Sequence, residues 1–402
     1  MIALAIDGGR PVRTAPLPTW PIFDGEEVAA VREVLNSGRV NYWTGPHGRA
    51  FEHEFATAVG TRYAVAMSNE TVALELALRA LGVGPGDEVV VPAATFFGVP
   101  SAVVHCGAKP VVADVELRTQ CLTAESVEAV LSERTRAVIA VHFSGHPAEI
   151  ATLLQLTEKR GIRVIEDCSQ AHGARYFGQP VGSFGDVATW SFCDDKIITT
   201  AGEGGAITTS DLKLWRRCWE LKEHGKNVAE MHRSSHQPRS RWLHDSFGTN
   251  ARITEVQAAI GRLQLAKLPN WVKQRQTNAS LLLDVLRGQS GIRVEDPPAH
   301  IEHSYHRFYA YIRAEQLAHG WNRDRVVTAI MAEGIPAGYG GCAEIYRERA
   351  FEGVEGSPAR LPVAAELGQT ALTLPVHPGL NTSDMMEVVA AVVKVLKAAT
   401  HE

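Results

Sequence analysis

The sequence predicts an α/β fold, in which a large domain with a mostly parallel central sheet precedes a smaller α+β C-terminal domain. Between about residues 60 and 210, short β-branched runs alternate with helical patterns, as they do in sheets of parallel strands. After Arg252 the pattern changes to long helices, followed by mixed strands and helices. We therefore expect an N-terminal arm and large domain over residues 1–267, and a small domain over residues 268–402.

Individual elements follow from the spacing of apolar residues. Runs rich in valine and isoleucine predict buried strands at residues 88–91, 110–113, 137–141 and 163–167. Helical spacing predicts helices at 71–81 and 148–159, and the first of these stops at Gly82, before a Gly-Pro-Gly-Asp turn. In the C-terminal part, two long helices are expected at 255–268 and 271–286, and a strand at 308–312.

Composition excludes several classes of protein. The 402 residues are 45% hydrophobic and 21% charged, with a net charge of −5, which is typical of a globular protein that does not bind nucleic acid. No apolar run is long enough to span a bilayer, and the N-terminus lacks the pattern of a signal peptide. The six cysteines are scattered and no histidines have metal-ligand spacing, so we expect a cytoplasmic protein with no disulfide frame and no metal.

A first candidate site lies at Ser68-Asn69-Glu70-Thr71, where a predicted strand passes into a helix. The exposed amides of a helix N-terminus, with hydroxyls nearby, form an anion site that suits a phosphate. A plain helix N-cap explains the same residues equally well. The stretch alone does not distinguish the two interpretations.

Asp167 is the second candidate, because it ends the predicted strand at 163–167. Open α/β sheets bind their ligands at the carboxyl ends of their strands, and an aspartate there can pair with a protonated ring nitrogen. Taken alone, however, a carboxylate that caps the following turn is the commoner explanation. Nearby His142, His146 and His172 are more simply explained as hydrogen-bonded structural residues.

The third candidate is Lys196, which lies between a probable strand and the glycines of Ala-Gly-Glu-Gly-Gly. A partly desolvated lysine has a lowered pKa and can form a Schiff base with an aldehyde. Ser191, five residues earlier, can offer its hydroxyl to the same phosphate. A phosphate cradle, a partner for a ring nitrogen and an amine are together what pyridoxal 5′-phosphate (PLP) requires, and their co-occurrence is stronger evidence than any one of them.

Three stretches also resemble a known family. They are the SxxxxK pattern followed by GEGG, the sequence EDCSQAHG at 166–173, and FGTNARITE at 247–255. They are similar to the motifs of the DegT/DnrJ/EryC1/StrS aminotransferases, in the same order and at similar separations, and the likeness runs from about residue 41 to 348. Members of this family aminate keto-sugars and in some cases cyclitols. The resemblance implies a fold-type I PLP-dependent transferase, similar to aspartate aminotransferase.

The resemblance also implies roles for residues. Lys196 matches the lysine that binds the cofactor, and Asp167 matches the acid that pairs with its pyridine nitrogen. Gln170 matches the residue beside the phenolic oxygen, and Phe96 the aromatic that stacks on the ring, with Phe97 as the alternative. The phosphate is expected to bind Ser191, the amides of Glu70 and Thr71, and Asn250 from a partner subunit, so a homodimer with shared active sites is implied. Tyr42, Trp43 and His224 are candidate substrate contacts.

Two expectations concern the charges around this site. Many family members have glycine where this chain has Glu70, and an anionic side chain beside a phosphate is repulsive. We therefore expect the Glu70 side chain to turn outward while its amide still binds. As a Schiff base, Lys196 would rely on the cofactor's phenolic oxygen, so neither Asp194 nor Asp195 is expected to balance it.

The sequence thus predicts an aminotransferase that moves an amino group from glutamate or glutamine to a nucleotide-linked keto-sugar. The alternative is a cyclitol aminotransferase of aminoglycoside pathways, since residues 200–205 resemble that branch as well. Sugar dehydratases of the same fold carry histidine at the lysine position, and Lys196 argues against them. A binding or regulatory homologue without activity is the non-enzymatic alternative, and Glu70 is its only support.

Overall fold

A computed structural model of the chain describes residues 3–229 and 244–400. Its large part is built on a seven-stranded sheet in the order β1-β9-β8-β5-β4-β2-β3. Strand β9 is antiparallel to both of its neighbours, and the other pairs are parallel. The strands are β1 (Tyr63–Met67), β2 (Glu88–Pro92), β3 (Lys109–Ala113), β4 (Thr135–Val141), β5 (Arg163–Asp167), β8 (Val187–Ser191) and β9 (Gly205–Thr209). The predicted α/β fold with a mostly parallel sheet is confirmed.

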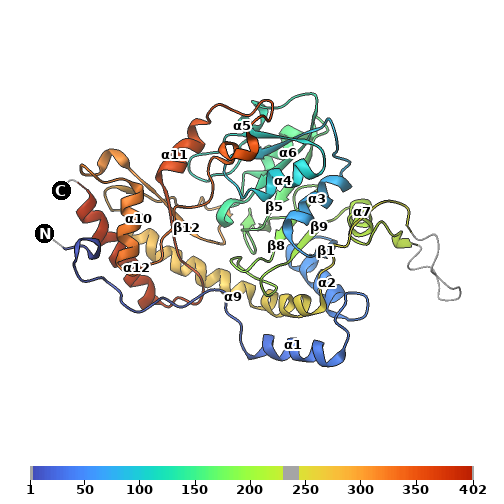
Figure 1. The fold of residues 1–402 in the computed structure, drawn as a ribbon, viewed down its shortest axis with the longest axis horizontal. Coiled ribbons are helices and arrows are strands. Elements are labelled where there is room, and N and C mark those ends of the chain that lie inside the picture. Colours follow the sequence, from blue (N-terminus) through green and yellow to red (C-terminus); the bar gives the residue numbers. More distant parts are fainter. Residues whose placement is uncertain (1–2, 230–243, 401–402) are drawn as a thin grey trace.

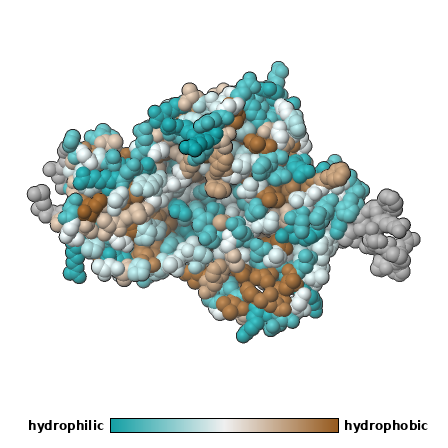
Figure 2. Space-filling view, viewed as in Figure 1, coloured by the Kyte–Doolittle hydropathy of each residue, from teal (hydrophilic) through white to brown (hydrophobic). Residues whose placement is uncertain are grey.

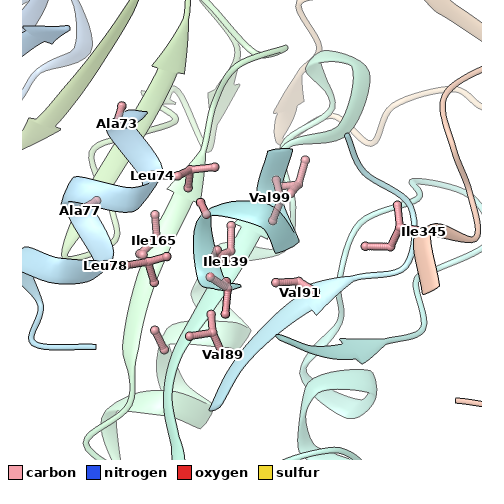
Figure 3. Close-up of a cluster of buried hydrophobic side chains, with 14 of the residues drawn as sticks. Ala73, Leu74, Ala77, Leu78, Val89, Val91, Val99, Ile139, Ile165 and Ile345 are labelled. Atoms are coloured by element: carbon pink, nitrogen blue, oxygen red, sulfur yellow. The ribbon is translucent and has the colours of Figure 1, made fainter. Parts of the chain in front are cut away.

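Helices cover both faces of this sheet. They are α2 (His47–Val59), α3 (Glu70–Ala80), α4 (Gly98–His105), α5 (Ala124–Glu128), α6 (Ile150–Glu158) and α7 (Leu212–Lys222). The inner faces of α3 and α4 pack on the apolar side chains of β2, β4 and β5, with Leu74 and Leu78 facing Val89, Ile139 and Ile165 (Figure 3). This packing fixes the N-terminus of α3 above the edge at which β5 and β8 end. The helices predicted at 71–81 and 148–159 correspond to α3 and α6.

The second part of the chain contains an antiparallel sheet in the order β10-β12-β13. Its elements are β10 (Ile292–Arg293), β12 (Phe308–Ile312), α10 (Arg323–Ala332), α11 (Pro362–Thr370), β13 (Ala371–Leu374) and α12 (Thr382–Ala399). Helices α10 and α12 share one apolar core with the sheet, and Leu4 and Leu17 of the N-terminal arm belong to that core. The first and last described residues of the chain lie beside these helices (Figure 1). Short strands β6 (Arg175–Tyr176), β7 (Gln179–Pro180) and β11 (Ile301–Glu302) form a third sheet.

One long helix, α9 (Glu255–Leu286), joins the two parts (Figure 1). The sequence predicts two helices separated at residues 269–270, and this prediction is wrong. Pro269 lies inside the continuous helix, where it removes one backbone hydrogen bond. The buried side chains Leu268 and Val272 on either side of it keep both halves packed, and this packing maintains the helix. The boundary predicted at residues 267–268 falls within α9 and stays a prediction.

Helix α1 (Gly25–Ser37) packs on α9 at one edge of the molecule (Figure 1). Its inner face buries Glu27 and Val34, whereas Val28 and Leu35 on the other face are 65% and 58% exposed. None of the described helices is both long and apolar enough to cross a membrane.

Candidate active site

Lys196 lies in the loop between β8 and β9, and internal hydrogen bonds hold this loop in shape. Phe192 N donates to Gly204 O over 2.8 Å, and Thr199 Oγ1 donates to Phe192 O over 2.9 Å. The Lys196 side chain is 17% exposed, and its own carbonyl accepts a 2.9 Å hydrogen bond from Trp20 Nε1. The lysine is therefore fixed at the edge of the large sheet.

The structure corrects the prediction about the charge of Lys196. Its Nζ forms a 2.8 Å ion pair with Oδ1 of Asp195, the preceding residue. Oδ2 of Asp195 lies 3.3 Å from Nη2 of Arg307 and 3.5 Å from Nε2 of His306. A partly buried ammonium needs a nearby anion, and Asp195 provides it. Burial opposes the ionisation of Asp195, but hydrogen bonds from His306 and Lys196 and the charge of Lys196 hold its pKa far below its ordinary value.

Asp167 lies at the carboxyl end of β5, as predicted, and its side chain is buried. Its Oδ1 accepts a 2.9 Å hydrogen bond from the amide of Ser169. Burial raises the pKa of Asp167, while hydrogen bonds with Ser169 and the charge of Lys196 oppose the rise. The carboxylate is thus held at the strand end, on the edge where Lys196 also lies.

The neighbouring Glu166 points to the opposite face of β5 and has a different role. Its carboxylate accepts hydrogen bonds from the amides of Gly182, Phe184 and Gly185 at 2.7–2.8 Å, and lies 3.0 Å from Nε2 of His142. Nδ1 of the same histidine accepts from the amide of Ala148. These partners satisfy Glu166 and His142 completely, so both are structural.

The Glu70 side chain turns into the protein, and the predicted outward orientation is wrong. Glu70 is 8% exposed, and its Oε1 is buried with no hydrogen-bond partner in residues 3–229 and 244–400. Its carboxyl group lies among Asp167, Lys196, Thr189 and Ser169. Burial, followed by the charge of Asp167, raises the pKa of Glu70 well above its ordinary value. Because a protonated carboxyl is neutral, this side chain can stay in the interior without placing a second anion beside a phosphate.

The residues expected to bind the phosphate meet at the start of α3. Gly205 of β9 pairs with Met67 on one side and with Ser191 on the other, so β9 brings Ser191 next to the loop that begins α3. Asn69 caps this helix, since its Oδ1 accepts from the amide of Val72 over 3.0 Å. In the described parts of the chain, no hydrogen bond uses the amides of Glu70 and Thr71. Free amides, the Ser191 hydroxyl and the helix N-terminus fit a phosphate.

The structure distinguishes Phe96 from Phe97. Phe97 packs edge-on against Phe351, with ring centroids 6.0 Å apart, and belongs to the core. Phe96 is 69% exposed. A Cβ added to Gly98 would lie 2.9 Å from Thr71 Oγ1 and 3.1 Å from the Phe96 ring, so both groups border the same point. Phe96 is therefore the free aromatic side chain beside the phosphate residues.

Gln170 follows Asp167 on the same edge, and its Oε1 accepts a 2.8 Å hydrogen bond from the amide of Ser144. His172, two residues further on, is 1% exposed and packs between the rings of Trp190 and Phe192. Burial lowers its pKa to about 3, so it is neutral at pH 7. Within the described residues neither of its ring nitrogens has a hydrogen-bond partner, so His172 packs as a structural residue but lacks the hydrogen bonds that the sequence predicts.

Asn250, Tyr42, Trp43 and His224 gather in a second cluster. Trp43 Nε1 donates to Glu223 over 3.1 Å, and Arg252 joins Glu223 to the Asn250 side chain. Tyr42 is buried and bonded to Glu52, whereas His224 is exposed. In the described residues of a single chain, no hydrogen bond or ion pair joins this cluster to Lys196.

Comparisons with known proteins agree with this arrangement. The sequence profile of the DegT/DnrJ/EryC1/StrS aminotransferase family matches residues 21–393. The chain belongs to this family. It is 36% identical over 381 residues, 95% of each chain, to the UDP-N-acetyl-3-dehydro-alpha-D-glucosamine 3-aminotransferase of Acidithiobacillus ferrooxidans. It is 38% identical to the L-glutamine:2-deoxy-scyllo-inosose aminotransferase of Streptomyces fradiae, over 81% of this chain and 77% of that one.

A solved structure shares the fold. The aminotransferase from Psychrobacter cryohalolentis superposes with a TM-score of 0.92 at 43% identity, over 95% of this chain and 99% of that chain. The protein is therefore an aminotransferase with the fold of this family. The sequence motifs pointed to Lys196, Asp167 and the residues expected to bind a phosphate. They did not reveal Trp20, Arg275, His306 and Arg307, which come from distant parts of the chain and have no motif in common.

Proposed function

We propose that the protein is a PLP-dependent aminotransferase that transfers an amino group from glutamate or glutamine to the ketone of a nucleotide-linked keto-sugar. The observation that carries the proposal is the meeting of Lys196, Asp167 and the free amides of α3 at one edge of the sheet. Each group fits one part of the cofactor: its aldehyde, its ring nitrogen and its phosphate. Ser191 and Phe96 border the same space.

In this proposal each residue has a defined task. Lys196 Nζ holds the cofactor and, once the donor amine has replaced it, moves a proton from the donor α-carbon to the cofactor. The Asp167 carboxylate holds the proton on the ring nitrogen. PLP supplies the electron sink that accepts the charge left on the α-carbon. Phe96 covers the ring and excludes water from its face.

We also propose a homodimer in which the second cluster serves the active site of the partner. Its residues lie apart from Lys196 in one chain, which supports a role across an interface. Near α1, Ile22, Phe23, Val28, Leu35 and Val40 are each at least 40% exposed, and Figure 2 shows an apolar patch at the edge where α1 lies in Figure 1. Patches of this kind mark interfaces. The six cysteines are free, which supports a cytoplasmic location.

The test is the visible absorbance of the purified protein. Bound cofactor should give an absorbance band that decreases when glutamate or glutamine is added. Lys196→Ala should lose the band and turnover, whereas Lys213→Ala, an exposed lysine on α7, should keep both. Full turnover by Lys196→Ala would contradict the proposed mechanism.

The second candidate function is amination of a cyclitol. The 38% identity to the inosose aminotransferase of Streptomyces fradiae supports this function, as the 36% identity to the Acidithiobacillus ferrooxidans enzyme supports a nucleotide-linked sugar. Enzyme that has taken up the amino group should be offered nucleotide-linked keto-sugars and inososes in parallel. The class that restores the absorbance band identifies the acceptor.

A further inference from the structure

A cleft of about 420 Å³ lies next to Lys196, between the N-terminal arm and the second part of the chain. The N-terminal arm contributes residues 17–20 to one wall, and residues 336–338 and 373–377 form another. Two residues that line the cleft contact Lys196: Asp195 pairs with its Nζ, and Trp20 donates to its carbonyl. The charged and ring-nitrogen groups in the cleft lining belong to Trp20, Asp195, Arg275, His306, Arg307 and His377.

Arg275 places a buried positive charge behind this cleft. The residue is 1% exposed, and its guanidinium lies 4.9 Å from the Trp20 ring centre. Nη1 donates to the carbonyls of Tyr305 and His306 at 3.1 and 3.0 Å, but Nε and Nη2 have no partner among the described residues. A buried guanidinium without a carboxylate partner is costly unless an anion accompanies it. Burial lowers its pKa only to about 9, so it remains charged at pH 7.

The cleft is therefore cationic. Burial lowers the pKa of both His306 and His377 to about 4, and both are neutral at pH 7. The charged groups in its lining are then Arg275, the half-exposed Arg307 and Asp195. Two guanidinium groups face one carboxylate, so the cleft favours an additional anion.

Asp195 shows that a carboxylate fits between the reactive amine and a guanidinium. One of its oxygens lies 2.8 Å from Lys196 Nζ and the other lies 3.3 Å from Arg307 Nη2. In an α-amino acid, the carboxylate is bonded to the carbon that carries the amine. When a donor amine takes the position of Lys196 Nζ, its carboxylate lies within reach of Arg307. A keto-sugar has hydroxyl groups at the corresponding position, because its phosphates lie farther from the ketone.

We propose that this cleft binds the α-carboxylate of the amino donor, with Arg307 as the direct partner and Arg275 as the charge behind it. The inference rests on the proposed function, since the donor amine must reach Lys196. Asp195 competes with the donor for Arg307 and turns away when the donor binds. Arg307 is thus a specificity residue for α-amino acids.

The experiment follows the reaction with the donor and the reaction with the acceptor separately, by absorbance. Arg307→Ala should raise the apparent Kd for glutamate or glutamine about 10- to 100-fold, the worth of one charge-assisted hydrogen bond, and leave the acceptor reaction unchanged. Arg307→Lys should recover part of the loss. Arg313→Ala, an exposed arginine just beyond β12, is the matched control. Asp195→Asn should act in the opposite direction and tighten donor binding, because the competing carboxylate is gone.

Glutarate, which has two carboxylates and no amine, is a probe that does not react. It should raise the melting temperature of the wild-type protein, and Arg307→Ala should abolish this shift. If no donor changes the wild-type absorbance, the proposed function fails, and the glutarate shift still tests the cleft. If donors react but Arg307→Ala binds them as wild type does, the inference is wrong. The inference is equally wrong if Arg307→Ala weakens only the binding of the acceptor, since the cleft would then bind a phosphate of the acceptor.

Discussion

Replacing Glu70 by glutamine should change how the stability of the cofactor-free protein depends on pH. The Glu70 carboxyl group is buried at the start of α3, with Oε1 unpartnered and Asp167 nearby. Burial and the charge of Asp167 raise its pKa, while Lys196, Thr189 and Ser169 act in the other direction. The folded chain therefore keeps a proton on Glu70 at pH values where the unfolded chain has lost it. Glutamine has the same shape and cannot ionise.

The size and sign of the effect follow from proton linkage. Above an ordinary glutamate pKa of 4.5, the folded wild-type protein holds one more proton than the unfolded chain at Glu70. The free energy of unfolding then falls by about 1.4 kcal/mol for each pH unit, until Glu70 ionises in the folded protein. Glu70→Gln removes this contribution, so the variant becomes more stable relative to the wild type as pH rises. Other shifted groups are present in both proteins and largely cancel in the difference.

The assay is urea or thermal unfolding of both cofactor-free proteins at several values between about pH 5 and pH 8. Glu75→Gln, a partly exposed carboxylate on the same helix, controls for the loss of one negative charge from α3. A difference between Glu70→Gln and wild type that stays constant with pH would refute the reasoning, since Glu70 would then ionise alike in the folded and unfolded states.

Three further predictions concern packing and assembly. Gly205→Ala should lower the free energy of unfolding by about 1–3 kcal/mol and weaken cofactor binding, because the added Cβ would lie 2.4 Å from the backbone carbon of Asn69, just before α3. Gly84→Ala, which has open space around it, is the control for both the unfolding and the binding measurement. Glu166→Ala should lower the free energy of unfolding by about 3 kcal/mol or more, since three amides lose their acceptor. Introducing aspartate at both Val28 and Leu35 should give a monomer in sedimentation, and unchanged association would place the dimer contact elsewhere.

The sequence predicted those features that depend on local periodicity and on motifs. The strand that ends at Asp167 and the helix that follows Asn69 were both predicted, because a short β-branched run and a capping residue are local signals. Their meeting at one edge follows from the rule that parallel strands end on the same side. The break expected near Pro269 failed, because packing along both halves of α9 outweighs the loss of one hydrogen bond.

The charges of the site were harder to predict, because they depend on contacts between distant residues. The Glu70 side chain can turn inward only because its surroundings, which include Asp167 and Thr189, favour a neutral carboxyl group. The residue at position 70 alone does not indicate these surroundings. The pairing of Asp195 depends on Arg307, which is more than one hundred residues away. Burial raises the pKa of Glu70, whereas ion pairing lowers that of Asp195, and both effects are properties of the fold.

Lys196 lies between two acidic environments, and their difference fits the proposed exchange of Lys196 for a donor amine. On one side, burial raises the pKa of Glu70 well above its ordinary value, so this carboxyl exerts less attraction on Lys196. On the other side, Asp195 stays ionised and holds Nζ at 2.8 Å. In the proposed mechanism, Asp195 would lose this partner when Lys196 binds the cofactor and would keep Arg307 and His306 until the donor carboxylate takes its place at Arg307. The ion pair therefore orients Lys196, and in the proposed mechanism Arg307 passes from Asp195 to the carboxylate of the donor.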